Sequence, residues 1–239
     1  MELIGTLGGA AVVRLPAELS TTAVARLADD FNRSVAAPDR LIVLRGADEA
    51  TFCTGLALDA DGPVETEAFA AVLAGLVDAP KPTLAFVDGR AIGGGLGLAS
   101  GCDWVVATER ATFALPELLW GLVPAMIWPL LTSRMTEGEA RRWTISAHSR
   151  TASAAMAAGL VDEIAAPGRH EAALARAVRM LSRLEPTALQ RMRRWSREAR
   201  DQPLAAVLAR GARLTAGMAE SAAARARIAA FRQGDSPWG

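Results

Sequence analysis

The stretch that decides the fold reads VDGRAIGGGLGLASGCD and runs from Val87 to Asp103. An apolar run at residues 83–87, typical of a buried strand, leads into three consecutive glycines and then into small residues that can form a buried helix. The first N–H groups of a helix have no partner inside it, and the helix dipole adds partial positive charge there. The pattern predicts a site for an anion or for a carbonyl oxygen that becomes negative, although close packing of a strand on a helix would use the same glycines.

Strands and helices alternate on both sides of this stretch. Strands are expected at 10–15, 41–46, 51–53 and 104–107, and helices at 23–31, after a Ser20 N-cap, and at 67–77, after an acidic loop at 58–66. This order predicts a parallel sheet with helices on its faces. Beyond Met135 the chain is rich in Ala, Arg, Leu and Glu, and helices are expected at 137–147, 151–158, 168–184, 186–200, 203–217 and 218–232. We therefore expect an α/β core over residues 1–185 and a helical region over 186–239.

Composition excludes several classes of function. The 239 residues are 51% hydrophobic and 22% charged, which is enough apolar material for a sizeable core. The 26 basic and 26 acidic side chains balance, so nothing favours nucleic acid or a membrane surface as a partner. Two cysteines without a CxxC spacing and only two histidines argue against a disulfide framework or a metal site. With no leader-like start and no apolar run of membrane-spanning length, a cytoplasmic protein is expected.

Two glycine turns are candidates for backbone hydrogen-bond donors. One lies at Thr54-Gly55 and the other at Gly94-Gly95. If the N–H groups of Thr54 and Gly94 converge, they form an oxyanion hole that stabilises an enolate made from a thioester, while Gly55 and Gly93 line the bound group. Losing one such donor typically costs about a hundred- to a thousand-fold in rate.

Glu117 is a lone carboxylate within the apolar run TFALPELLWGLVP at residues 112–124. A glutamate after a proline also fits an ordinary helix start, because the helix dipole favours a negative charge there. In an apolar pocket, however, burial raises the pKa of a carboxyl group and makes it suitable for general acid–base work near neutral pH. The local pattern leaves both interpretations open.

The sequence resembles the crotonase, or enoyl-CoA hydratase/isomerase, superfamily over essentially its whole length. The matching pieces are FCTG at 52–55, KPT at 81–83, GRAIGGG at 89–95, CD at 102–103, PE at 116–117, GLVP at 121–124, AGLVDE at 158–163 and AAFR at 229–232. The resemblance implies a β-β-α spiral core, a C-terminal helical region that forms a homo-trimer, and an acyl thioester substrate. It implies that Thr54 and Gly94 supply the oxyanion donors and that Glu117 is catalytic.

The sequence departs from the superfamily pattern in three places, and these departures narrow the expected reaction and substrate. Hydratases carry a second glutamate where this chain has Gly97, so two-glutamate addition of water is not expected. The segment at 14–20 lacks the usual loop that contacts the coenzyme A nucleotide. The aspartate that usually follows the first oxyanion turn is Ala57.

These departures, with the run at 115–131 and the SPW ending at 236–238, resemble the dehydratases of polyketide β-branching cassettes. The resemblance implies dehydration of a 3-hydroxy-3-methylglutaryl (HMG) group on an acyl carrier protein. Phosphopantetheine of that carrier, or coenzyme A, would hold the substrate, and no other cofactor or metal is expected. Gly97 would make room for the branched β-carbon, Glu117 would move the protons, and Arg134 or Arg90 would bind the distal carboxylate.

Several alternatives remain open at this point. A double-bond isomerase would use the same single glutamate, and a decarboxylase of the same cassettes would share the fold, although those enzymes generally lack Pro-Glu at this position. A non-catalytic thioester-binding subunit would fit Gly97 and Ala57, but both donor turns and Glu117 are retained. A dinucleotide-binding domain is disfavoured, because GGGLG at 93–97 is not G-x-G-x-x-G.

Overall fold

The structure is a computed structural model that describes residues 4–57, 66–200 and 202–233. The chain divides into two compact units, Met1–Gln190 and Arg191–Gly239. The sequence placed the boundary after residue 185, at the start of helix α8 (Pro186–Ala199), whereas the observed division falls inside that helix. The expected loop at 58–66 lies almost entirely outside the described residues.

The first unit contains a large sheet with six strands among the described residues. Its order is β1-β2-β3-β5-β7-β10, and every neighbouring pair is parallel except β1 with β2. The strands are β1 (Ile4–Leu7), β2 (Ala10–Leu15), β3 (Leu41–Gly46), β5 (Thr83–Val87), β7 (Trp104–Thr108) and β10 (Glu163–Ala165). The strands expected at 10–15, 41–46, 83–87 and 104–107 are therefore confirmed.

A second, smaller sheet has the order β4-β6-β8-β9. Its strands are β4 (Thr51–Cys53), β6 (Arg90–Ile92), β8 (Thr112–Ala114) and β9 (Arg150–Thr151), and the first three run parallel. In chain order, β3 is followed by β4, β5 by β6 and β7 by β8, so the chain steps repeatedly from the large sheet to the small one. With helices after β4 and β6, this is the β-β-α spiral that the sequence predicts.

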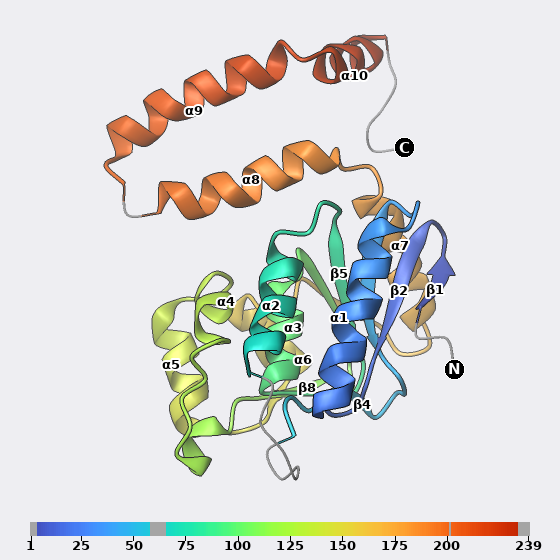
Figure 1. The fold of residues 1–239 in the computed structure, drawn as a ribbon, viewed down its shortest axis with the longest axis vertical. Coiled ribbons are helices and arrows are strands. Elements are labelled where there is room, and N and C mark those ends of the chain that lie inside the picture. Colours follow the sequence, from blue (N-terminus) through green and yellow to red (C-terminus); the bar gives the residue numbers. More distant parts are fainter. Residues whose placement is uncertain (1–3, 58–65, 201, 234–239) are drawn as a thin grey trace. The chain divides into compact units, whose positions relative to one another are not determined.

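Helices bury both faces of the large sheet (Figure 1). Helices α1 (Thr21–Ala36), α2 (Thr66–Val77) and α3 (Gly94–Gly101) pack on one face, and α7 (His170–Leu181) packs on the other. Side chains alternate between the faces along each strand, as period-2 geometry requires. On β2, for example, Val13 and Leu15 face the first cluster, whereas Ala10 and Val12 face the second.

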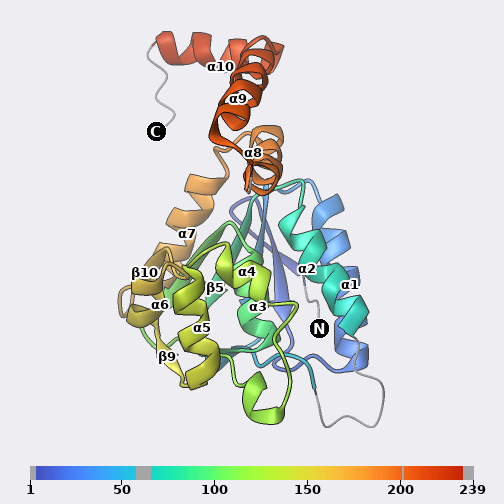
Figure 2. The ribbon, with the colours of Figure 1, turned by 90° about the vertical axis from the view of Figure 1, so that its left-hand side faces the viewer.

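The helices expected after Met135 are present. They are α5 (Glu137–Ser146), α6 (Ala152–Ala158) and α7, followed by α8, α9 (Leu204–Ala219) and α10 (Ala222–Arg232). Two shorter pieces precede them, the 3-10 helix η1 (Glu117–Trp120) and α4 (Trp128–Thr132) (Figure 2). Local capping agrees with the sequence, because the Ser20 side chain accepts a hydrogen bond from the N–H of Ala23 at the start of α1.

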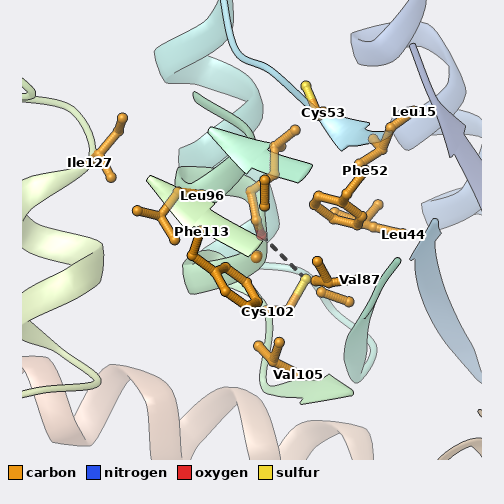
Figure 3. Packing of buried hydrophobic residues seen from close by; sticks show 14 of the residues in the cluster. Leu15, Leu44, Phe52, Cys53, Val87, Leu96, Cys102, Val105, Phe113 and Ile127 are labelled. Carbon is orange, nitrogen blue, oxygen red and sulfur yellow. Dashed lines mark hydrogen bonds between the residues drawn. The ribbon is translucent and has the colours of Figure 1, made fainter. Parts of the chain in front are cut away.

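The space between the small sheet, α3 and α4 is tightly filled. Figure 3 shows Phe52, Leu96, Phe113 and Ile127 packed within the first hydrophobic cluster. Each of these side chains is at most 5% exposed. Among the described residues, no helix combines the length and apolar character that crossing a membrane requires. No group of three or more His, Cys, Asp or Glu side chains suited to a metal ion occurs within the same residues.

Candidate active site

The site lies where three neighbouring parallel strands of the small sheet end. Parallel strands present their carboxyl ends at one edge of a sheet, so the residues that follow β4, β6 and β8 lie side by side. These residues are Thr54–Leu56, Gly93-Gly94 and Glu117, and all of them line one cavity of about 420 Å³. Three segments that are far apart in the sequence therefore meet in the way that the two-turn interpretation requires.

The two glycine turns are in contact. A Cβ atom added to Gly55 would lie 2.7 Å from the backbone nitrogen of Gly94, and one added to Gly94 would lie 3.2 Å from the Cα of Gly55. Gly55 also has a positive φ of 87°, which side chains rarely adopt. Gly55 therefore has to be glycine for this approach, and a side chain at position 94 would need its neighbours to shift.

The structure corrects the predicted identity of the first donor. The N–H of Thr54 already donates to the carbonyl oxygen of Ala17 at 2.7 Å, so it is not free to bind a substrate oxygen. The Thr54 hydroxyl donates to the same oxygen, and the N–H of Gly55 points toward Sγ of Cys53 at 3.5 Å. The prediction that Thr54 supplies a backbone donor is therefore wrong.

The backbone N–H of Leu56, rather than that of Thr54, is available as the first donor. Leu56 pairs with Leu19 in an isolated parallel bridge, whose two hydrogen bonds use the carbonyl of Gly55 and the N–H of Ala57. Successive N–H groups of an extended segment point to opposite sides. The N–H of Leu56 thus points away from Leu19, and within the described residues it has no hydrogen-bond acceptor. A signal was present in the sequence, because Gly55 allows the turn that exposes the next amide.

The second donor is where the sequence places it. Gly94 is the first residue of α3, and its N–H has no acceptor among the described residues. The preceding Gly93 has a φ of 52° and donates its own N–H to Ala114 at 3.0 Å, which leaves the next amide facing the cavity. Gly95 serves packing instead, because a Cβ there would lie 1.9 Å from the carbonyl oxygen of Cys53. The glycine run therefore serves both purposes that the sequence suggests: Gly94 offers a backbone donor, and the adjacent Gly95 allows close packing.

Glu117 begins η1 directly after β8 and turns its carboxyl group into the cavity. Its Oε1 lies 3.0 Å from the position that a Cβ of Gly93 would occupy, so the carboxyl group is next to the second glycine turn. Its Oε2 is buried and has no hydrogen-bond partner. Burial raises the pKa of Glu117, and a hydrogen bond from its own backbone N–H offsets part of that rise. An unpartnered carboxyl group with a raised pKa is suited to proton transfer.

Gly97 does not line the cavity, contrary to the prediction that it opens space for a substrate. A Cβ at position 97 would lie 3.2 Å from Cγ1 of Ile127 and 3.7 Å from Cδ2 of Leu73. The volume that glycine leaves open is therefore filled by Ile127, which itself lines the cavity.

Arg134 is structural and does not line the cavity, so the prediction that it binds substrate is wrong. Its guanidinium group donates to the carbonyls of Ser100 at 3.1 Å and Cys102 at 2.5 Å, at the end of α3, and to that of Leu160 at 3.3 Å. It also forms an ion pair with Asp162 at 3.0 Å. Every nitrogen of the group is thus engaged away from the cavity. The other candidate, Arg90, is exposed and contacts Thr51.

The cavity wall is mostly apolar. After Glu117 a single segment supplies Trp120, Leu122, Val123 and residues 124–127, and Phe69 and Ile92 complete the apolar lining. The lining residues within the described chain include no lysine or arginine. A site of this composition can hold an apolar chain next to a carbonyl group and a carboxyl group.

A β-β-α spiral core that brings two backbone amides and one carboxyl group into a single apolar cavity defines a structural class of protein. The comparisons with known proteins place the chain within that class. A sequence model of the family described as enoyl-CoA hydratase/isomerase matches residues 18–238. The chain belongs to this family.

Individual relatives agree with that placement. YngF of Bacillus subtilis (strain 168) is 33% identical over 146 residues, which is 58% of this chain and 55% of YngF. A Rhizobium meliloti (strain 1021) protein named "Probable enoyl-CoA hydratase" is 32% identical over 191 residues, 77% of this chain and 70% of that protein. The alignment with YngF thus spans about half of that relative. Among solved structures, Pseudomonas aeruginosa AtuE superposes with a TM-score of 0.85 at 29% identity, covering 99% of this chain and 98% of AtuE.

Proposed function

We propose that this protein is an enzyme that moves protons at the carbons next to the carbonyl of an acyl thioester, with chemistry of the enoyl-CoA hydratase/isomerase type. One observation carries the proposal. Within the described residues the N–H groups of Leu56 and Gly94 have no acceptor, and they share an apolar cavity with the half-buried carboxyl group of Glu117, whose Oε2 is buried and has no hydrogen-bond partner. Family membership and the fold support the same conclusion.

The two amides act on the thioester carbonyl. Removal of a proton from the α-carbon places negative charge on the carbonyl oxygen, and donors that are already oriented stabilise that charge without reorganising. The N–H of Gly94 adds the positive end of the α3 dipole. This pair of donors accounts for the need for glycine at positions 55 and 94, because a side chain at either position would push the two turns apart.

Glu117 carries the protons in this mechanism. As a carboxylate it takes the α-proton, and as a carboxylic acid it then delivers a proton to a neighbouring carbon or to a departing β-hydroxyl group. Its raised pKa brings the two protonation states closer in free energy near neutral pH. One residue serves both steps because the atoms involved lie within a few ångströms of each other.

The finer proposal is dehydration of an HMG group on an acyl carrier protein, and it rests on the sequence resemblance. A carrier-bound thioester has phosphopantetheine but no adenosine, which suits the short segment at 14–20. The distal carboxylate of HMG requires a cation, and the described lining of the cavity contains none. An acyl group without a charged end therefore fits the described lining better, and coenzyme A is the alternative carrier.

A homo-trimer is the proposed assembly. In the second unit Met192, Leu204, Leu208 and Ile228 are between 45% and 72% exposed, which is unusual for large apolar side chains in a lone chain. Association with other copies would cover them. Analytical ultracentrifugation should give three times the mass of the 25.0 kDa chain, and a monomer across the micromolar range would contradict the proposal.

The activity is tested with HMG on a carrier protein and with straight-chain 2-enoyl and 3-enoyl thioesters of coenzyme A, all in deuterated water. Mass spectrometry separates loss of water, loss of carbon dioxide, addition of water and α-deuterium exchange. We expect exchange with at least one thioester, and we expect Glu117→Gln to slow it by about a thousand-fold. The matched control is Glu137→Gln, an exposed glutamate at the start of α5. Absence of exchange with every thioester, or equal rates for Glu117→Gln and the control, would contradict the proposal.

A further inference from the structure

We infer that Ile127 is a specificity-determining residue: it fills the space beside the first turn of α3 and keeps that side of the cavity dry, so that the enzyme shifts a double bond rather than adds water. The inference rests on the proposed function, because it concerns which outcome follows removal of the α-proton. Among the outcomes proposed above it selects the double-bond shift over dehydration, because dehydration is the reverse of hydration and needs the same space for water. It assigns a role to the contact between Ile127 and Gly97.

Position 97 lies beside the cavity wall, in the first turn of α3 that Gly94 begins. Gly97 itself does not line the cavity, but a side chain at this position would point toward Ile127, which does. In this chain the side chain of Ile127 already fills the space that a side chain at position 97 would enter. Its Cγ1 lies 3.2 Å from the position that a Cβ of residue 97 would have.

Ile127 is held firmly and cannot withdraw. Its side chain is 4% exposed and belongs to the first hydrophobic cluster, where Figure 3 places it with Leu96 and Phe113. Its backbone is fixed at the start of α4, because its N–H donates to Pro124 at 3.1 Å and its carbonyl accepts from Leu131 at 3.0 Å. Because Ile127 is closely packed, its side chain keeps its position in the cavity wall.

Water has few partners along this wall. A bound water molecule typically makes about three hydrogen bonds to polar groups. Within the described lining, hydroxyl and carboxyl groups come only from Thr54, Thr66 and Glu117, and the Thr54 hydroxyl already donates to Ala17. Around Ile127 the neighbouring lining residues are Ala125 and Met126. Among the lining residues that the structure describes, none besides Glu117 is an acid–base group that could orient a water molecule there.

The two outcomes differ in their atoms. In a double-bond shift, Glu117 takes a proton from C2 of a 3-enoyl thioester, the electron pair enters a dienolate held by the two amides, and the proton returns to C4 while C2=C3 forms. Hydration of a 2-enoyl thioester instead forms an O–C3 bond from water and a new C2–H bond. The first outcome requires one carboxyl group and no water, whereas the second requires an oriented water molecule.

The experiment compares wild type with Ile127→Ala, Ile127→Val and the control Ile145→Ala. Ile145 is an isoleucine on α5 that is 62% exposed and is not part of the cavity lining. Each variant receives 3-hexenoyl and 2-hexenoyl thioesters of coenzyme A in deuterated water, and the ratio of hydration to isomerisation is measured. We expect hydration in the wild type to be at least a hundred-fold slower than isomerisation. We expect Ile127→Ala to raise the ratio ten-fold or more, Ile127→Val to raise it less, and Ile145→Ala to leave it unchanged.

The failures of the two proposals are distinguishable. If the wild type shows no Glu117-dependent α-deuterium exchange with any thioester, the proposed function fails and the inference fails with it. If exchange occurs but the wild type hydrates as fast as it isomerises, or Ile127→Ala and Ile145→Ala change the ratio equally, only the inference is overturned. Should Ile127→Ala not fold, an unchanged ratio in Ile127→Val overturns it. A further gain of hydration in the Gly97→Glu/Ile127→Ala double variant supports it.

Discussion

At the scale of the residue, Glu117 combines reactivity with an energetic cost. A carboxyl group with one buried, unpartnered oxygen is destabilised when it ionises, and this is why its pKa is raised. The same environment opposes folding at pH values where the group must be charged. Function and stability therefore conflict at this position, as they often do in active sites.

This conflict predicts a pH-dependent stability for Glu117→Gln. The raised pKa means that the folded state binds the proton more tightly than the unfolded state, so the stabilising contribution is complete at low pH and is lost as pH rises through the folded pKa. Glutamine stays neutral throughout. The melting temperature of Glu117→Gln relative to wild type should therefore rise between about pH 4 and about pH 8. Scanning calorimetry measures it, and a difference that stays constant or falls would refute this account.

Arg134 differs from Glu117, because all of its hydrogen bonds stabilise the fold and none of its nitrogens faces the cavity. Replacement by leucine removes the cation paired with Asp162 and removes one hydrogen-bond donor each from the carbonyls of Ser100 and Cys102. Breaking a largely buried ion pair of this kind should lower the free energy of unfolding by about 3 kcal/mol. Urea denaturation measures the loss. KM of the folded variant should match wild type, and a rise in KM without a loss of stability would restore the substrate-binding prediction.

At the scale of the element, the site depends on how closely α3 approaches β4. The helix begins against the backbone that follows β4, and this contact brings the amides of Leu56 and Gly94 into one cavity. The pairing of β4 with β6 sets the same spacing from the strand side. The oxyanion hole is thus a property of two elements in contact, and neither element makes it alone.

Gly95→Ala should disrupt this contact. The new Cβ would lie 1.9 Å from the carbonyl oxygen of Cys53, and backbone atoms on both sides have to shift to admit it. We expect a loss of about 3 kcal/mol or more in the free energy of unfolding, together with a fall in kcat from displaced donors. Gly138→Ala on α5, where nothing lies within 4 Å of the added atom, is the matched control. Wild-type stability in Gly95→Ala would show that the contact is looser than described.

At the scale of the whole molecule, the first unit buries its reactive groups except at the cavity. Cys53 and Cys102 are the two cysteines of the chain, and both are buried thiols that form no disulfide. Burial raises the pKa of the Cys53 thiol to about 12, with a smaller contribution from Glu18 and a partial offset from the Gly55 N–H. A thiol that stays protonated is a poor nucleophile. Cys53 therefore has a structural role in the core, although it is next to the Thr54-Gly55 turn.

Thiol labelling tests how well the folded unit is closed. We expect no reaction with Ellman's reagent near pH 8 over an hour and two thiols per chain after denaturation, because only the unfolded chain exposes them. The absorbance of the released thiolate gives the count. Rapid reaction of one thiol in the folded protein would mean that the core opens locally and often.

The sequence by itself determined the elements and the segments that meet. Alternating apolar residues predict the strands, and helical spacing predicts α5 to α10, because both patterns depend on neighbours along the chain. Local features, namely a helix start and a carboxylate in an apolar run, made Gly94 and Glu117 candidates for a site but left a structural interpretation open, and both residues line the cavity. Family resemblance added the spiral arrangement that local patterns do not contain.

Only the tertiary structure decided which groups in those segments are free. The Thr54 N–H donates to Ala17, and the guanidinium group of Arg134 binds four partners. The space beside Gly97 is filled by the side chain of Ile127. Each of these contacts joins residues that are distant in the sequence. A hydrogen bond or a filled volume across such a separation is set by how the elements pack, and no local pattern records whether an N–H group, a guanidinium group or a glycine remains unoccupied.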